Sequence, residues 1–223
     1  MVRAPNVVVL LLLATCPVRA QDATILFHVP ATNDDRSPIE RPLIVALHPY
    51  SSSAAEMLPA FRALADATGA VLALPHGPVP AGNGFDWVSA EQADVVVMDA
   101  IESARKRAPF DARQIVLAGF SQGATMAMRV ALRHPDKVRG VMAIAGRHDE
   151  RFVPGADAER ARRLRVALLV GGDDANAASN REAEERLRAA RYSVLLRVYP
   201  DVGHRLPPNA LYEMKDAIGF LLR

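Results

Sequence analysis

The sequence offers almost nothing for covalent cross-linking. Its 223 residues contain a single cysteine, Cys16. A disulfide needs two cysteines, so none can form within this chain. Stability must then come from packing, and half of the residues are hydrophobic. This length and apolar content predict one globular domain with one sizeable core.

The sequence also lacks an excess of charge of either sign. Lys and Arg total 27 and Asp and Glu total 25, for a formal net charge of +2. The arginines are scattered beside acids and form no basic block with interleaved aromatic residues, so no nucleic-acid partner is predicted. The apolar stretch at residues 7–14 is too short to cross a bilayer, and no stable membrane span is predicted. Internal repeats and low-complexity segments are also missing.

Residues 1–20 differ in character from the rest of the chain. Arg3 supplies a positive charge, an apolar stretch covers residues 7–14, and a small-residue cleavage pattern ends at Ala20. This order is typical of a secretory signal peptide. We therefore expect a mature, exported chain of residues 21–223 that forms a single domain.

Cys16 lies inside this predicted signal peptide, so the mature chain would carry no thiol. The tetrapeptide Leu-Ala-Thr-Cys that ends at Cys16 partly resembles a lipoprotein signal, although threonine before the cysteine is atypical. A lipid anchor through Cys16 is the alternative to free export.

Apolar runs of strand length alternate with longer amphipathic stretches from about residue 24 to the end. Such alternation predicts βαβ units, with a mostly parallel central sheet flanked by helices. A polar, turn-rich segment at residues 33–38 suggests a hairpin-like connection between the first two strands. The predicted strands cover residues 24–29, 43–47, 71–74, 114–118, 138–144, 166–170 and 194–199.

Serine capping patterns mark three helix starts in the sequence. The spacing Ser-x-x-Glu or Ser-x-x-Gln is that of a capping box, in which serine accepts a backbone hydrogen bond. It occurs at Ser53 with Glu56, at Ser89 with Gln92 and at Ser179 with Glu182. Further helices are expected after Ser121, over residues 157–165 and over residues 211–222.

One short stretch, Gly119-Phe120-Ser121-Gln122-Gly123, has the form G-x-S-x-G. A buried strand precedes it and a helical pattern follows it. This arrangement is typical of a nucleophile elbow, in which a strained turn lifts a serine hydroxyl clear of the sheet. The flanking glycines allow strand and helix backbones to approach closely. Ser121 is therefore the predicted nucleophile.

A serine nucleophile needs a base, and the sequence contains six histidines. In this type of sheet the partners follow in the order serine, acid, histidine. Of the histidines after Ser121, His134 ends the elbow helix far from the serine, and His148 precedes any acid at a later strand end. His204 follows both an acidic turn and a strand, so it is the predicted base.

The acid is expected in the loop after residues 166–170, where Asp173 and Asp174 are adjacent. Successive residues point to different sides, so only one carboxylate can face His204. For the oxyanion hole we expect two backbone N–H groups, one from Gln122 and one from Tyr50 in the loop after residues 43–47.

The loop at residues 75–88 is long and carries the only tryptophan, Trp87, together with Phe85. Long loops in compact domains are often functional. Phe85 and Trp87 are predicted to line the substrate entrance. The alternative is that Trp87 anchors the loop against the core.

From about residue 40 onward, these motifs resemble the α/β-hydrolase superfamily. The closest similarity is to the phospholipase/carboxylesterase group that includes acyl-protein thioesterase-like enzymes, with small feruloyl and polyhydroxyalkanoate depolymerase-like esterases as relatives. The resemblance rests on Leu47-His48-Pro49-Tyr50-Ser51-Ser52-Ser53, the elbow, the acidic turn and Gly203-His204. It implies an α/β-hydrolase fold and hydrolysis of carboxylic esters or thioesters through an acyl-enzyme, without metal or cofactor.

The resemblance also separates the two aspartates. The acid loop of these relatives often runs glycine, two variable residues, aspartate, one variable residue and asparagine, and residues 171–176 match with Asp174 in the acid's place. One departure is that the group usually has glycines where this chain has Pro49 and Ser51. Pro49 has no N–H and stiffens the loop that is expected to form part of the oxyanion hole.

The expected function is hydrolysis of small-molecule carboxylic esters with small or medium acyl groups. The chain has little length for a large lid, which favours an open, shallow pocket. A thioesterase, lipase or peptidase using the same residues is an alternative, as is a non-catalytic binding protein with this fold. The complete set of serine, acid and histidine favours an enzyme.

Overall fold

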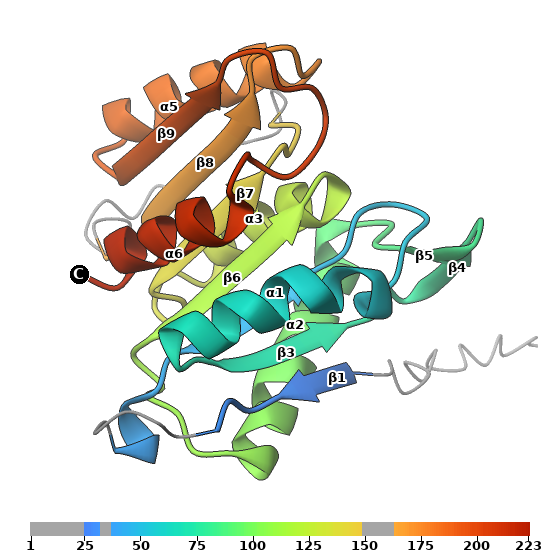
Figure 1. Cartoon of the computed structure of the whole chain (residues 1–223), viewed down its shortest axis with the longest axis vertical. Coiled ribbons are helices and arrows are strands. Elements are labelled where there is room, and N and C mark those ends of the chain that lie inside the picture. The colour runs from blue at the N-terminus through green and yellow to red at the C-terminus, as the bar shows by residue number, and fades with distance from the viewer. Residues whose placement is uncertain (1–24, 32–36, 149–162) are drawn as a thin grey trace, which may run out of the picture.

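The computed structural model describes residues 25–31, 37–148 and 163–223 (Figure 1). The predicted signal peptide lies outside the described residues, as does most of the helix expected over 157–165. Among the residues that are described, none of the helices is long and apolar enough to cross a membrane.

A seven-stranded sheet forms the centre of the molecule, in the order β1-β3-β2-β6-β7-β8-β9. Every neighbouring pair is parallel except β1 with β3, so the predicted mostly parallel sheet is confirmed. The strands are β1 Ile25–His28, β2 Leu43–Leu47, β3 Val71–Pro75, β6 Ile115–Phe120, β7 Gly140–Ile144, β8 Arg165–Gly171 and β9 Ser193–Tyr199.

The hairpin-like connection expected between the first two strands is wrong. Strand β1 pairs with β3, so that Ile25 lies opposite Pro75 and His28 opposite Leu72. Strand β2 already has β3 on one side and β6 on the other, so it has no free edge for β1. A local turn signal therefore does not decide strand pairing, because partner choice depends on which edge of the sheet is open.

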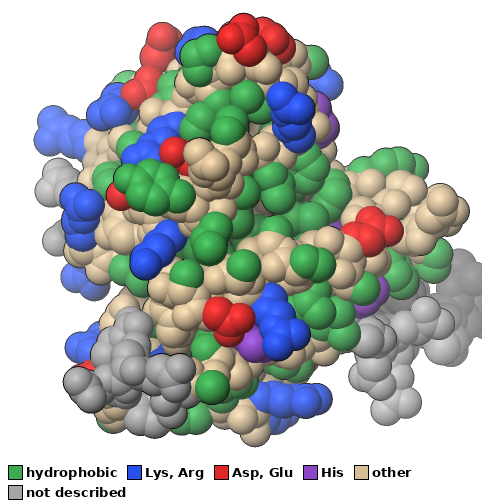
Figure 2. Space-filling view, viewed as in Figure 1, with side chains coloured by type: hydrophobic (Ala, Val, Ile, Leu, Met, Phe, Trp, Pro, Cys, Tyr) green, Lys and Arg blue, Asp and Glu red, His purple; other side chains and the backbone are tan. Residues whose placement is uncertain are grey.

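Helices cover both faces of the sheet and bury two apolar layers (Figure 1). Leu43, Val45 and Leu47 face the layer of α2, α3 and α5, whereas Ile44 and Ala46 face the layer of α1 and α6, as strand alternation requires. Figure 2 shows apolar side chains at the surface between α1 and α6. The helices are α1 Ala54–Thr68, α2 Ala90–Arg107, α3 Gln122–Arg133, α5 Ala177–Ala189 and α6 Ala210–Leu221, with a 3₁₀ turn at Pro38–Glu40.

Two of the predicted helix caps are confirmed. The Ser53 hydroxyl accepts the Glu56 N–H at 3.3 Å, and the Ser89 hydroxyl accepts the Gln92 N–H at the same distance. Helix α1 ends on Gly69, whose φ of 69° is the left-handed value that favours glycine.

The cap predicted at Ser179 is wrong, because α5 begins three residues earlier than predicted, with Asn176 at its N-cap. Asp174 Oδ1 accepts the Asn176 N–H at 2.8 Å, which turns the chain into the helix before Ser179 is reached. The Ser179 hydroxyl instead donates to the Asn176 carbonyl at 3.0 Å.

The long loop between β3 and α2 contains a small antiparallel hairpin, formed by β4 Val79–Ala81 and β5 Gly84–Asp86. This β4–β5 hairpin projects from the end of the sheet at which the parallel strands terminate (Figure 1). Ligands of open α/β sheets bind at that end, so the hairpin is placed to affect a site there.

Candidate active site

Ser121 lies in a strained turn between β6 and α3. Its φ of 55° and ψ of −121° are unusual for a residue with a side chain, and its N–H donates to the Ile144 carbonyl at 2.9 Å. A Cβ on Gly119 would lie 2.4 Å from the Gly123 carbonyl carbon, and one on Gly123 would lie 2.2 Å from the Leu47 oxygen. Only glycines permit this approach of strand, helix and neighbouring loop.

His204 connects Ser121 to Asp174. Its Nε2 lies 2.9 Å from Ser121 Oγ, and its Nδ1 lies 2.8 Å from Asp174 Oδ2. Because a carboxylate only accepts, we assign the ring proton to Nδ1, which leaves Nε2 as acceptor for the serine hydroxyl. The Asp174 side chain is 1% exposed and the His204 side chain 44% exposed. A buried carboxylate thus holds a histidine whose other side is open to substrate and water.

The structure separates the two adjacent aspartates. Asp174 uses Oδ2 for His204 and Oδ1 for the Asn176 N–H, so both of its oxygens are engaged. Asp173 is exposed, and its backbone N–H donates to the Val202 carbonyl at 3.0 Å. Asp174 therefore contacts the histidine, and Asp173 belongs to the surface of the turn.

The two residues expected to supply oxyanion-hole N–H groups follow neighbouring strands of the sheet. Strands β2 and β6 pair in parallel with Leu47 opposite Gly119, and Tyr50 and Gln122 each follow three residues later. Gln122 is the first residue of α3, where a backbone N–H has no partner within the helix. The Gln122 N–H, on the residue after Ser121, therefore has no helix partner, and Tyr50 occupies the matching position after the neighbouring strand.

A buried histidine supports the loop at residues 48–52, hereafter called the oxyanion loop because it is expected to supply the Tyr50 N–H. His48 Nδ1 donates to the Pro49 carbonyl at 2.7 Å, and Nε2 accepts the Gly77 N–H at 2.8 Å. Burial lowers the pKa of His48 below its ordinary value of 6.5. The ring is therefore neutral and joins the oxyanion loop to the chain after β3.

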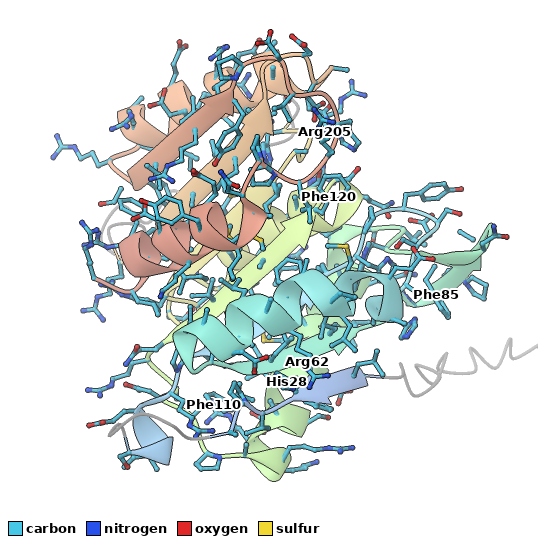
Figure 3. The ribbon with its side chains drawn as sticks, in the orientation of Figure 1. His28, Arg62, Phe85, Phe110, Phe120 and Arg205 are labelled. Atoms are coloured by element: carbon cyan, nitrogen blue, oxygen red, sulfur yellow. The ribbon has the colours of Figure 1, made fainter. Side chains whose placement is uncertain are left out.

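Trp87 is fully buried, and its indole N–H donates to the His48 carbonyl at 2.8 Å. Its ring lies 4.9 Å from the His48 ring. This is the anchoring role that sequence reasoning held as the alternative, because a buried indole offers no surface to a substrate. Phe85 is partly exposed on the hairpin and packs edge-on against His76 at 4.5 Å (Figure 3).

Sequence reasoning missed a side-chain pair beside the elbow. Gln122 Nε2 donates to Asp86 Oδ1 at 2.6 Å, and Gln122 Oε1 accepts the Trp87 N–H at 3.5 Å. Local patterns carry no signal for this pair because 36 residues separate Asp86 from Gln122.

Phe120 is the last residue of β6 (Figure 3), and its ring lies 5.1 Å from the His204 ring. In the described part of the chain, no group of three or more His, Cys, Asp or Glu side chains is arranged to hold a metal ion.

The mostly parallel sheet and the strained serine between β6 and α3 define an α/β-hydrolase fold. A model of the Phospholipase/Carboxylesterase family matches residues 89–222, more than half of the chain. The chain belongs to this family.

Solved structures share the fold at low sequence identity. Esterase PE8 superimposes with a TM-score of 0.70 and 20% identity, over 90% of this chain and 98% of its own. A Bacillus cereus carboxylesterase superimposes with a TM-score of 0.67 and 18% identity, over 90% of this chain and 95% of its own.

A curated relative is closer in sequence. NocK of Nocardia uniformis subsp. tsuyamanensis, a protein named as an esterase, is 35% identical over 119 residues. The match covers 49% of this chain and 34% of NocK, so the chain spans about a third of that relative's length.

Proposed function

We propose that this protein is a serine esterase that cleaves carboxylic esters with small or medium acyl groups. Ser121 is the nucleophile, His204 the general base and Asp174 the residue that orients the histidine. The observation that carries the proposal is the continuous hydrogen-bonded path from Ser121 Oγ through the His204 ring to the buried Asp174 carboxylate.

In the acylation step, Ser121 Oγ attacks the ester carbonyl carbon and passes its proton to His204 Nε2. The carbonyl oxygen becomes an oxyanion, which accepts the backbone N–H groups of Gln122 and Tyr50. Asp174 stabilises the imidazolium. When the tetrahedral intermediate collapses, the bond to the alkoxide breaks and Nε2 returns the proton to the leaving alcohol.

In the deacylation step, water replaces the alcohol. His204 Nε2 takes a proton from the water as its oxygen attacks the acyl carbon, and the same backbone donors receive the oxyanion. Collapse releases the carboxylic acid and returns the proton to Ser121 Oγ, so the enzyme is regenerated.

The exposure of the site supports small or medium esters. The His204 side chain is 44% exposed beside the Ser121 hydroxyl. An open site of this kind buries little of a long acyl chain, so chain length adds little binding energy.

A fluorophosphonate probe tests the nucleophile, because it reacts only with a serine activated by a base and an oxyanion hole. We expect wild type to be labelled and Ser121→Ala to be unlabelled, with turnover of nitrophenyl esters reduced by about 10⁶ in the variant. Ser103→Ala, on α2 and away from the site, is the matched control and should keep both properties. Labelling of Ser121→Ala as strong as wild type contradicts the proposal.

A substrate panel then tests the ester class. Nitrophenyl esters of increasing chain length should give the highest kcat/KM at short or medium chains. A feruloyl ester and an acyl thioester run beside them separate an aromatic esterase or a thioesterase from the proposed activity. A kcat/KM that rises steadily to long chains would instead indicate a lipase.

A further inference from the structure

The β4–β5 hairpin is joined to the oxyanion loop by backbone pairing. The Ser51 N–H donates to the Phe85 carbonyl at 3.0 Å, and the Phe85 N–H donates to the Ser52 carbonyl at 2.9 Å. A Cβ on Gly84 would lie 2.1 Å from the Ser52 oxygen, and one on Gly82 2.1 Å from the Ser51 hydroxyl. The hairpin thus continues the loop that carries Tyr50, and the backbone contact with Ser52 requires glycine at position 84.

The same hairpin reaches the elbow through Asp86, the last residue of β5. One carboxylate oxygen, Oδ1, accepts the Gln122 side-chain N–H at 2.6 Å and the Val88 backbone N–H at 2.9 Å. The second bond holds the carboxylate in place, because Val88 is itself fixed in a left-handed turn with φ of 54°. Hydrogen bonds to an ionised acceptor are stronger than neutral ones, so this is a firm attachment.

The side chain and the backbone of Gln122 therefore have separate roles. Its side chain is fixed to Asp86 and, at 3.5 Å, to the Trp87 N–H. Its backbone N–H is the donor that the proposed mechanism directs at the oxyanion. Oxyanion donors are effective when they are fixed before charge develops, since no reorganisation is then needed during the reaction.

We propose that Asp86 is a positioning residue of the oxyanion hole. The Asp86 side chain holds Gln122, and strand β5, which carries Asp86, pairs with the oxyanion loop. The backbone donors of Gln122 and Tyr50 are thus positioned by the same hairpin. This inference rests on the proposed function, since it assigns Asp86 a role in the same site.

The first test compares two changes at one position. Asp86→Ala removes the acceptor of Gln122 and should lower kcat about 10- to 100-fold, less than the full loss of a donor, which costs about 10² to 10³. KM should change by less than about threefold, because the donors act mainly on the transition state. Asp86→Asn keeps an acceptor oxygen and should recover most of the loss. Asp99→Ala on α2 removes an exposed carboxylate elsewhere and should match wild type.

The second test reads the oxyanion hole directly. A trifluoromethyl ketone forms a tetrahedral adduct with an active serine and places an oxyanion in the hole, so its inhibition constant should rise in Asp86→Ala by about the same factor as kcat/KM falls. Gln122→Ala removes the other half of the pair and should give a similar loss. The double variant should lose little more than either single one, because both break one interaction.

The outcomes distinguish this inference from the proposed function. If Ser121→Ala keeps its turnover, the proposed function fails. If Ser121→Ala is inactive but Asp86→Ala and Gln122→Ala keep wild-type kcat and inhibitor affinity, the positioning role alone is overturned, and a change confined to melting temperature or KM has the same meaning. Should Asp86→Ala not fold, Gln122→Ala decides the matter with the same two readouts.

Discussion

The two ends of the sheet are built differently. At the end where the parallel strands terminate, residues with side chains adopt left-handed backbone: Ser51 follows β2, Ser121 follows β6, Ala145 follows β7 and Asp201 follows β9. At the opposite end, α1 ends at Gly69, a glycine with positive φ. Within the described ranges, Arg191 is the one non-glycine residue with positive φ at that end.

This contrast indicates where the fold tolerates strain. A left-handed non-glycine residue costs about 1 to 3 kcal/mol and persists only where the surroundings determine its conformation. Between the two ends the central strands are regular, and all five residues of β2 are buried. The strained residues thus lie at the end of the sheet that carries Ser121, and the regular core fixes their conformation. Catalysis and stability therefore depend on different parts of the fold.

After Ser121→Ala, the largest expected effect lies at the strained end and differs between two adjacent aspartates. Asp174→Asn should lower kcat by about 10⁴, because the histidine loses the partner that sets its tautomer, whereas Asp173→Asn should change kcat only a few-fold. Both are measured with one nitrophenyl ester, with folding checked by circular dichroism. A large loss at Asp173 together with a small one at Asp174 would reverse the assignment.

The regular interior should show the opposite behaviour. Leu117 is fully buried in the middle of β6, and Leu117→Ala should lower the free energy of unfolding by about 2 to 5 kcal/mol through lost burial and a cavity. The folded fraction, counted by fluorophosphonate titration, should keep a kcat near wild type. Urea unfolding gives the stability. A strong fall in kcat per titrated site would show that strain at the elbow is not insulated from the core.

His48 belongs both to the buried interior and to the strained end, because its ring is buried and neutral and supports the oxyanion loop. Its pKa is lowered by burial, so below about pH 6.5 the unfolded chain binds a proton more readily than the folded one. Stability should therefore be complete above pH 6.5 and fall as pH decreases, by at most about 1.4 kcal/mol per pH unit for one proton.

Urea midpoints at pH 7.5, 6.5 and 5.5 measure this effect. His48→Gln should have the flatter pH dependence, while His76, whose pKa burial also lowers, remains in both proteins. If the urea midpoint depended on pH equally in wild type and His48→Gln, His48 would not be the cause of the pH dependence.

The smallest expected effect measures the strain itself. Ala145→Gly and Ala143→Gly remove the same methyl group from buried positions on or just after β7, but only Ala145 has a positive φ, of 53°. Both changes raise the entropy of the unfolded chain equally, so their difference reports the backbone strain. Ala145→Gly should be the more stable of the two by about 1 kcal/mol in urea unfolding. Equal stabilities would mean that the left-handed turn is not strained.

Short-range patterns accounted for much of the fold. The caps at Ser53 and Ser89 and the stop at Gly69 act within four residues, so their chemistry can be read directly from the chain. The cap at Ser179 failed because Asp174 turned the chain earlier, and that aspartate is occupied with a residue 30 positions away. A local rule gave the wrong start where a distant contact had already set the backbone.

By itself, the sequence predicted the strands of the central sheet, most of the helices and the elbow at Ser121, because periodicity and glycine placement act locally. Chain order placed an acid and His204 after the serine, and the family resemblance separated Asp174 from Asp173. Tertiary structure alone decided that β1 pairs with β3, that Trp87 is buried against His48, and that Asp86 holds Gln122. Each of these depends on which edge is open, or on which groups meet across tens of residues. Such contacts are selected by packing and leave no periodic signal in the chain.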